Sequence, residues 1–278
     1  EMSVKDFYRD DFWPLDNEDK TDNFIYRETP SEILKGTFNG QSDDVTKLWA
    51  NQYKSIARAN TILANMDKAV NMGISEVKLK QYEGEAFFQR ASCYARLVTY
   101  FGDVIYVTEV VDIDKAFTLG RTAKSEIVPK IYEDYDKAIE NLPEKYSGLS
   151  SQRATKGAAL ALKARFALYM GDWDIVADAT KKCMDLGIYK LHKDYSDLFL
   201  STTKNSEESI FLLPRSIEYK VTLGNWTVMN EVLRNPGGWG AFAPSWDLLA
   251  AYTCTDGLPI DESPLFDPHN PFKNRDPR

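Results

Sequence analysis

Two helix ends in this 278-residue chain carry the same four-residue pattern, and the pattern limits the folds open to it. Residues 100–103 (YFGD) are matched by residues 169–172 (YMGD), an offset of 169 − 100 = 69 residues. Under the same shift Ala95 meets Ala164 and Arg96 meets Arg165. Gly ends one helix and Asp caps the next, so each pattern predicts a helix-turn-helix. Helix pairs of this kind bury their apolar stripes by stacking on one another.

The offset of the repeat also indicates which kind of stack to expect. It is about twice the roughly 34-residue period of tetratricopeptide repeats. We therefore predict a mainly α fold of tetratricopeptide-like helix pairs, an α-α superhelix, with minor β segments. The small Ala95 and Ala164 are expected to let neighbouring helices approach closely.

The first long helix is predicted from one stripe of residues that begins near Thr46. Steps of four and three residues place the members of this stripe on one face of a 3.6-residue helix. They are Trp49, Tyr53, Ile56, Asn60 and Leu63. We expect Asp43 or Asp44 to cap the start of this helix and Gly73 to mark its end.

Four more helices are expected at about 76–101, 122–142, 155–170 and 173–186. The inward residues predicted for the first of these are Tyr82, Ala86, Ala91, Tyr94 and Leu97. Asp172 is the expected N-cap of the last one, and Gly102 suits the left-handed position that closes the first.

The long helices cease after Lys190, which divides a helical scaffold (46–190) from a loop-rich segment (191–278). Residues 104–107 and 207–213 are predicted to be short strands or extended pieces. Residues 214–245 are rich in Gly and Pro, and aromatic residues are interleaved there and just beyond: Tyr219, Trp226, Trp239, Phe242 and Trp246. A loop of this length is usually functional when it is ordered.

Composition excludes several classes of protein. No stretch approaches the roughly 20 apolar residues of a membrane span. A formal net charge of -8 argues against nucleic-acid binding, which depends on clustered Lys and Arg. Three widely spaced cysteines exclude a zinc ribbon and a dithiol motif, and we expect Cys93 and Cys183 to be buried core residues.

No arrangement of residues in the sequence requires an enzyme. The G-x-S-x-G, H-E-x-x-H and Walker motifs are absent. His192 and His269 each stand alone, and the carboxylates at 16–19 and 43–44 lie in polar sequence that is more typical of a solvated face or a cap. The 16–19 segment also lacks the Gly and the distal Glu of an EF-hand loop. We predict no catalytic residues, no metal site and no cofactor.

The aromatic content of 13% is high and favours sugar binding by the loops. A sugar ring stacks its C–H face on an aromatic ring, while its hydroxyls bond to Asn, Asp or Arg beside it. Such polar residues accompany the aromatics in both loop regions: Asp22, Asn23, Arg27, Asn39, Asn225 and Asn235. The alternative is that these aromatics plug the end of the helical stack, and both readings stay open for each Trp.

Several ordered motifs resemble those of the SusD/RagB family. They are W-x3-Y-x2-I-x2-A-N-x-I-L (49–63), G-E-A-x-F-x-R-A (84–91) with YFGDV (100–104), T-K-G-A-A-x-A-L-x-A-R (155–165) with GDW (171–173), and F-x-P-S-x2-L-L-x2-Y (242–252) with DG-x-PI (256–260) and NRDPR (274–278). Together they cover most of the chain in the family's order.

The resemblance implies a surface-exposed, lipid-anchored outer-membrane protein of Bacteroidetes without catalytic activity. It would bind glycans, or in some members other nutrients, for delivery to a SusC-like TonB-dependent transporter. The chain would be one SusD-like domain over 1–278, incomplete at both ends, with its lipid anchor outside the sequence. Ligand contacts carried over by position from the family's loops are Arg27, Phe38, Asn39, Tyr219, Trp226 and Trp239.

Two other classes of function stay open at this point. A tetratricopeptide adaptor would grip a protein or peptide partner in a groove lined by the repeat helices, far from residues 214–245. A glycosidase would release reducing ends from a polysaccharide. A lipobox Cys upstream of the sequence would favour the uptake protein over the adaptor.

Overall fold

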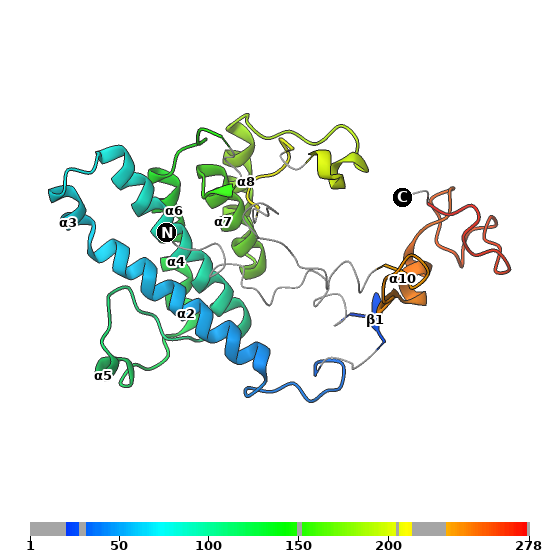
Figure 1. Cartoon of the computed structure of the whole chain (residues 1–278), viewed down its shortest axis with the longest axis horizontal. Coiled ribbons are helices and arrows are strands. Elements are labelled where there is room, and N and C mark those ends of the chain that lie inside the picture. The colour runs from blue at the N-terminus through cyan, green and yellow to red at the C-terminus, as the bar shows by residue number, and fades with distance from the viewer. Residues whose placement is uncertain (1–20, 28–31, 149–151, 204–205, 213–231, 277–278) are drawn as a thin grey trace. The chain divides into compact units, whose positions relative to one another are not determined.

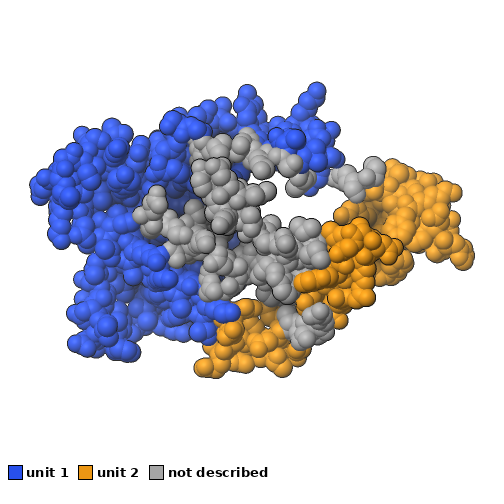
Figure 2. Space-filling view, in the orientation of Figure 1, with its two compact units in different colours: residues 1–9, 46–214 blue, residues 10–45, 215–278 orange. Residues whose placement is uncertain are grey.

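The computed structural model describes residues 21–27, 32–148, 152–203, 206–212 and 232–276 (Figure 1). The chain divides into two compact units (Figure 2). The described part of unit 1 lies within residues 46–214, and that of unit 2 lies within 10–45 and 215–278. Most of the described secondary structure is helical, which confirms the predicted mainly α fold.

The helices of unit 1 follow one another in the predicted order. They are α2 (Asp43–Ala64), α3 (Met66–Asn71), α4 (Glu76–Phe101), α5 (Ile113–Ala116), α6 (Lys124–Asn141), α7 (Lys156–Met170) and α8 (Trp173–Asp185), followed by the short 3-10 turns η3 (Asp197–Phe199) and η4 (Ser201–Thr203). α4 packs against α6, α6 against α7, and α7 against α8. Helices α4, α6, α7 and α8 thus each pack on a neighbour, as stacked helix pairs require.

Helix α2 has the predicted stripe but different ends. Ile56 and Asn60 are buried, and the other three members of the stripe are partly buried against the core. The helix starts at Asp43, so Asp43 and Asp44 occupy its first turn instead of capping it. Carboxylates in the first turn are stabilised by the positive end of the helix dipole. The helix ends at Ala64, and Gly73, with φ +76°, follows α3 instead.

Helix α4 is the centre of the core. Ala86, Ala91, Tyr94 and Leu97 are buried as predicted, whereas Tyr82 is 43% exposed, so that prediction was wrong. The reason is that the tightly packed part of α4 begins at Gly84, and before it the helix buries only Leu79. A Cβ on Gly84 would lie 2.9 Å from Leu142 Cγ, so the end of α6 packs directly on this glycine.

The two Gly-Asp turns use their carboxylates in different ways. Gly102 and Gly171 both have positive φ, +67° and +81°, but only Gly171 takes the left-handed helical conformation, because the ψ of Gly102 is -115°. Asp103 Oδ1 accepts a hydrogen bond from the backbone N–H of Lys124 at 2.8 Å, so it caps α6. Asp172 is the N-cap residue of α8, as predicted, but its side chain makes no capping hydrogen bond; instead Oδ2 accepts a hydrogen bond from the hydroxyl of Tyr132 on α6 at 2.5 Å. The carboxylate therefore links α6 to the turn between α7 and α8.

A buried polar network holds the segment that follows α4. Arg90 on α4 donates to both carboxylate oxygens of Asp134 on α6, at 2.7 and 2.8 Å, and to Asn60 Oδ1 at 3.0 Å. Asn60 Nδ2 on α2 then donates to the carbonyls of Val107 at 3.0 Å and Glu109 at 3.1 Å. Side chains from three helices thus hold one backbone segment, residues 105–109, which we call the strap. This role accounts for the Asn in the motif at 49–63 and for the Arg in the motif at 84–91.

Tyrosine hydroxyls complete the attachment of this strap. The Tyr94 hydroxyl accepts from Val107 N–H and donates to Val107 C=O, and Tyr53 donates to Ile105 C=O at 2.8 Å. Because side chains satisfy this backbone, the predicted strand at 104–107 is reduced to one bridge between Val104 and Thr122. The expected extended piece at 207–213 is made of turns and bends over its described residues, where Phe211 packs on Phe88 at 5.3 Å.

Unit 2 is built around a two-stranded antiparallel sheet. Strand β1 (Phe24–Tyr26) pairs with β2 (Phe242–Pro244), with Tyr26 opposite Phe242. Ser245 then caps helix α10 (Trp246–Ala251), because its Oγ accepts from Leu248 N–H at 3.1 Å. The three cysteines of the chain are buried and free, as predicted for Cys93 and Cys183.

Candidate functional site

The two loop regions predicted to contact a ligand meet within unit 2. Pairing of β1 with β2 continues one residue further, where Arg27 N–H donates to Ala241 C=O at 3.0 Å. The Arg27 backbone therefore lies beside Ala241, which follows Trp239 by two residues at the end of the Gly-rich segment. Figure 1 shows β1 next to α10, although the two are more than 200 positions apart in sequence.

The Gly-rich loop, residues 232–240, folds back on itself. Gly238 N–H donates to Leu233 C=O at 3.0 Å, and Gly240 N–H donates to Val232 C=O at 2.9 Å. A Cβ on Gly238 would lie 2.0 Å from the carbonyl oxygen of Val232, so only glycine fits there. The closed loop presents Trp239 with 37% of its surface exposed.

The remaining predicted contact residues have different environments. Arg27 is exposed at the end of β1, and Phe38 is 43% exposed in the turn before α2. Asn39 is exposed, but its amide shapes that turn, since Nδ2 donates to Thr37 C=O at 2.9 Å and Oδ1 accepts from Gln41 N–H at 2.8 Å. Tyr219 and Trp226 lie outside the described residues.

A pocket of about 280 Å³ is lined by strand β1 and its neighbours, and among its lining residues only Asp22 is a binding candidate predicted from the sequence. Its lining comes from two distant segments: Thr21, Asp22, Phe24, Ile25, Tyr26 and Leu34, together with Ser245 and Asp247. Asp22 is named in the sequence analysis as a polar residue of the first loop, but Asp247 is not. The P-S-x2-L-L motif could have identified Asp247, because Ser245 is the N-cap of α10 and Asp247 follows in the first turn of that helix.

Ser245 joins the two halves of this pocket. Its N–H donates to Asn23 C=O at 2.7 Å, and its Oγ donates to the carbonyl of Asp22. Tyr26 stacks on Phe242 across the strands, with ring centroids 4.7 Å apart and planes 28° apart. The pocket wall is therefore fixed by backbone pairing, one serine and one aromatic pair.

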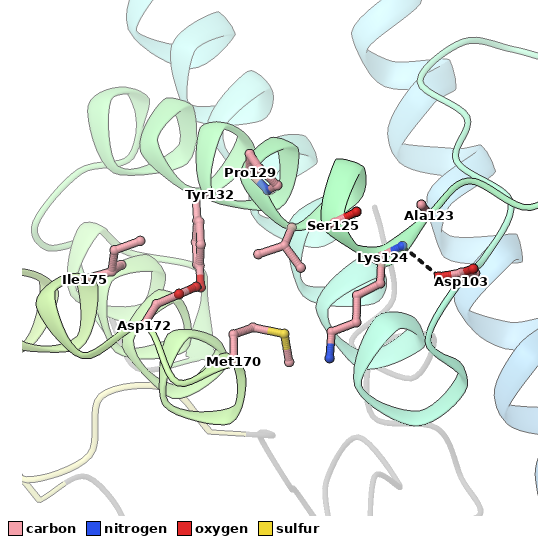
Figure 3. A pocket seen from close by; sticks show the side chains of 10 residues that line it. Asp103, Ala123, Lys124, Ser125, Pro129, Tyr132, Met170, Asp172 and Ile175 are labelled. Carbon is pink, nitrogen blue, oxygen red and sulfur yellow. Dashed lines mark hydrogen bonds between the residues drawn. The ribbon is translucent and has the colours of Figure 1, made fainter.

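A larger cavity of about 720 Å³ lies in unit 1, where the two Gly-Asp turns meet α6 (Figure 3). Its walls are mostly apolar side chains: Val128, Pro129, Met170 and Ile175. Lys124 and Ser125 also line the cavity. The cavity thus offers an apolar surface with a cation.

The Tyr132–Asp172 pair forms the other side of this cavity. Burial, and then the neighbouring Asp172 carboxylate, raise the pKa of the Tyr132 phenol above its ordinary value. The phenol therefore stays a neutral hydrogen-bond donor at physiological pH, which suits a structural tie better than proton transfer.

Other candidate chemistry is confined to local contacts. Within the described residues, no three His, Cys, Asp or Glu side chains come close enough to hold a metal ion. His192 bonds to its own loop, through its N–H to Glu208 and its ring Nδ1 to Ser206 at 3.0 Å. No helix in the described part of the chain has both the length and the apolarity of a membrane span.

A family model described as "Starch-binding associating with outer membrane", of SusD-like type, matches residues 10–168, more than half of the chain. "SusD-like protein P25" of Formosa agariphila is 30% identical over 176 residues, which cover 62% of this chain and 32% of that protein. A "SusD-like protein" of Bacteroides ovatus is 23% identical over 238 residues, covering 78% of this chain and 42% of that protein.

The structure of the chain is also similar to solved structures of SusD-like proteins. A SusD-like carbohydrate-binding protein of Bacteroides fragilis superposes with a TM-score of 0.80 and 28% identity, covering 94% of this chain and 51% of that one. The chain therefore spans about half the length of this solved relative, and 32% and 42% of the two curated ones.

Proposed function

The chain belongs to the SusD-like family, and we propose that it binds glycans at the cell surface without cleaving them. The observation that carries the proposal is the closed loop 232–240, which exposes Trp239 and leads into Ala241, the backbone partner of Arg27 at the end of β1. An exposed aromatic ring next to a polar side chain suits a sugar ring, which has one apolar face and hydroxyls around its edge. The carbohydrate-binding relative of Bacteroides fragilis supports the same class of ligand.

The proposed ligand contacts are those predicted from the sequence. Arg27, Phe38, Asn39 and Trp239 are exposed residues of unit 2, and Tyr219 and Trp226 complete the proposed set. Asn39 contributes mainly by shaping its turn, because both its amide nitrogen and its amide oxygen already have backbone partners. Aromatic stacking with flexible polar contacts tolerates many sugars, so the proposal names the class of ligand and not one glycan.

The proposed cellular role is nutrient uptake. The protein would be tethered to the outer membrane by a lipid and would pass its glycan to a SusC-like TonB-dependent transporter. The family description, which joins starch binding to association with the outer membrane, supports this role. Copurification of such a transporter with the protein from outer membranes would test it, and a protein recovered only from the soluble fraction would contradict it.

The glycan proposal is tested by calorimetry and a glycan array on the full chain. Trp239→Ala is expected to weaken binding about tenfold, because one aromatic contact contributes roughly 1 kcal/mol beyond its buried area. Trp173→Ala is the matched control, since Trp173 is 66% exposed but begins α8 in unit 1. Equal binding by Trp239→Ala and wild type would contradict the site, and steady release of reducing ends would contradict the absence of catalysis.

A second candidate, peptide binding by the helical scaffold, is favoured by the cavity beside α6. Its apolar walls and the Lys124 cation suit an apolar side chain next to an acidic one better than they suit a sugar. A peptide array that contains acidic-apolar sequences would test this function. Binding that is lost in Met170→Asp but kept in Trp239→Ala would favour the adaptor, and no peptide binding would remove it.

A further inference from the structure

We propose that the pocket lined by β1 selects neutral and amino sugars and disfavours glycans that carry uronate or sulfate groups. The inference deepens the proposed glycan binding and rests on it. It starts from a cavity that residues from two distant parts of the sequence build together, with both Asp22 and Asp247 in its lining.

The size and walls of the pocket suit one sugar unit. Its volume of about 280 Å³ is just below the range of ligand pockets, which run from roughly 300 to 1,000 Å³, so it has room for a small ligand. Phe24, Ile25 and Leu34 give it an apolar wall, and Tyr26 is held in place by its stack on Phe242. An apolar wall with polar groups at the rim matches a pyranose ring, whose faces are C–H and whose edge is hydroxyl.

One residue, Ser245, fixes the backbone segments that carry the two carboxylates. Ser245 donates from Oγ to the Asp22 carbonyl and from N–H to the Asn23 carbonyl, while the same Oγ caps α10. Asp247 lies in the first turn of that helix. Ser245 itself is buried, so the backbone that carries both carboxylates is fixed before any ligand arrives.

The charge of the pocket is uncompensated within the described part of the chain. Neither the Asp22 nor the Asp247 carboxylate forms a hydrogen bond or an ion pair there, and none of the described residues that line the pocket is Lys, Arg or His. Ionised carboxylates only accept hydrogen bonds, so they bind sugar hydroxyls as donors. An ammonium group adds attraction, whereas a second carboxylate or a sulfate is repelled.

Repulsion between the two carboxylates and a negative charge on a bound sugar is not fully screened by salt at the short distances inside a pocket. The Debye length is about 8 Å at physiological salt, so a charge on a bound ring lies within reach of both carboxylates. The net charge of -8 has the same sign and adds to the discrimination. Salt is therefore expected to reduce the preference.

A glycan array with neutral, amino and acidic oligosaccharides in several linkages tests the inference. The probes include hexamers of β-1,4-linked glucose, glucosamine and glucuronate, which differ mainly in charge. We expect wild type to prefer neutral and amino members over acidic ones by about fivefold to tenfold at low salt, and by less at 0.5 M salt.

The test variant is Asp22→Asn/Asp247→Asn, which keeps the side-chain size and removes both charges. It is expected to bind acidic members about as well as neutral ones and to lose the preference for amino sugars. Asp261→Asn/Glu262→Gln is the matched control, because it removes the same charge from exposed residues of unit 2 outside the pocket. This control is expected to keep the wild-type preference.

The outcomes separate the two proposals. Absence of binding to every glycan would contradict the proposed function itself. Glycan binding with equal or better affinity for acidic members, or a preference that survives in Asp22→Asn/Asp247→Asn, would overturn the inference and leave glycan binding intact.

Discussion

Arg90 and Asp134 form a bidentate ion pair in the interior of the helical unit. Arg90 Nε lies 2.7 Å from Asp134 Oδ2 and Nη2 lies 2.8 Å from Oδ1, and the two residues are 5% and 3% exposed. The remaining donor, Nη1, bonds to Asn60 Oδ1 at 3.0 Å. Because Asn60 also donates to the carbonyls of Val107 and Glu109, the ion pair and Asn60 together connect α2, α4 and α6 with the strap that follows α4.

Removal of one partner of this pair is predicted to destabilise unit 1 strongly. Asp134→Ala leaves the Arg90 guanidinium buried without a carboxylate, which costs about 3–5 kcal/mol in comparable pairs. Urea unfolding followed by circular dichroism measures the change. Asp185→Ala is the control, because its pair with Lys181 at 3.0 Å is exposed, and a loss below about 1 kcal/mol is expected. Equal losses in the two variants would contradict a structural role for the buried pair.

Stability is predicted to fall at alkaline pH because of the tyrosines around the strap. Burial raises the pKa of Tyr53 and of Tyr106 to about 12, and it raises that of Tyr94 further. A raised pKa in the folded state means that the folded protein holds these protons more tightly than the unfolded chain, whose tyrosines titrate near 10. The contribution to stability is therefore complete below pH 10 and is lost as the pH rises toward 12.

Unfolding by urea at pH 7, 9, 10 and 11, with phenolate absorbance read at 295 nm, checks this pH dependence. Tyr53→Phe is expected to flatten the decline above pH 10, because it removes one of the groups that ionise on unfolding. The variant also loses the bond to Ile105 C=O, which lowers stability at pH 7 by about 1 kcal/mol. Constant stability from pH 7 to 11 would be incompatible with the burial of these hydroxyls.

Local patterns in the sequence were sufficient to predict the long helices, but not the short α5 and α10 or every contact between helices. The buried stripe on α2 and the glycines that end α4 and α7 depend on residues a few positions apart, so the sequence was sufficient to predict them. Asp172 was expected to serve the adjacent helix because that is the local option. Its partner is Tyr132, 40 positions earlier, and nothing in the sequence marks the two as neighbours.

The ligand-binding surface shows the same limit. Trp239 and Arg27 could be named from residue types in the loops, but the strand pairing that joins their segments could not. The pocket lined by Asp22 and Asp247 depends on that pairing and on Ser245, and no sequence pattern relates two carboxylates that are 225 positions apart. A residue-type argument finds candidates, whereas long-range backbone bonds decide which of them share a site.

Loss of the Tyr132 hydroxyl is predicted to weaken the tie between α6 and the α7–α8 turn. In Tyr132→Phe, the partly buried Asp172 carboxylate loses its donor at 2.5 Å, and a cost of about 1–3 kcal/mol is expected. Tyr169→Phe is the control, because Tyr169 is 63% exposed at the neighbouring turn. Thermal unfolding compares the two. If the loss comes from the stranded charge, the added change Asp172→Asn should recover part of the stability in the Tyr132→Phe background.

Gly238 is predicted to be essential for the shape of the proposed glycan-binding loop. In Gly238→Ala, the new Cβ would lie 2.0 Å from the Val232 carbonyl oxygen, and that oxygen belongs to backbone already bonded to Gly240 N–H. The loop must open, and Trp239 moves away from the end of β1. We expect glycan affinity to fall about tenfold, as in Trp239→Ala, because both changes remove the same aromatic contact.

The control for this change is Gly40→Ala, since nothing lies within 4 Å of a Cβ at that position and its φ is not positive. Calorimetric titration with a glycan that wild type binds, together with urea unfolding of each variant, gives the comparison. Gly238→Ala should lose affinity while the unfolding of the helical unit stays unchanged, because none of the core residues of α4, α6 and α7 lies in the loop. Full affinity in Gly238→Ala would mean that the geometry of loop 232–240 does not determine glycan binding.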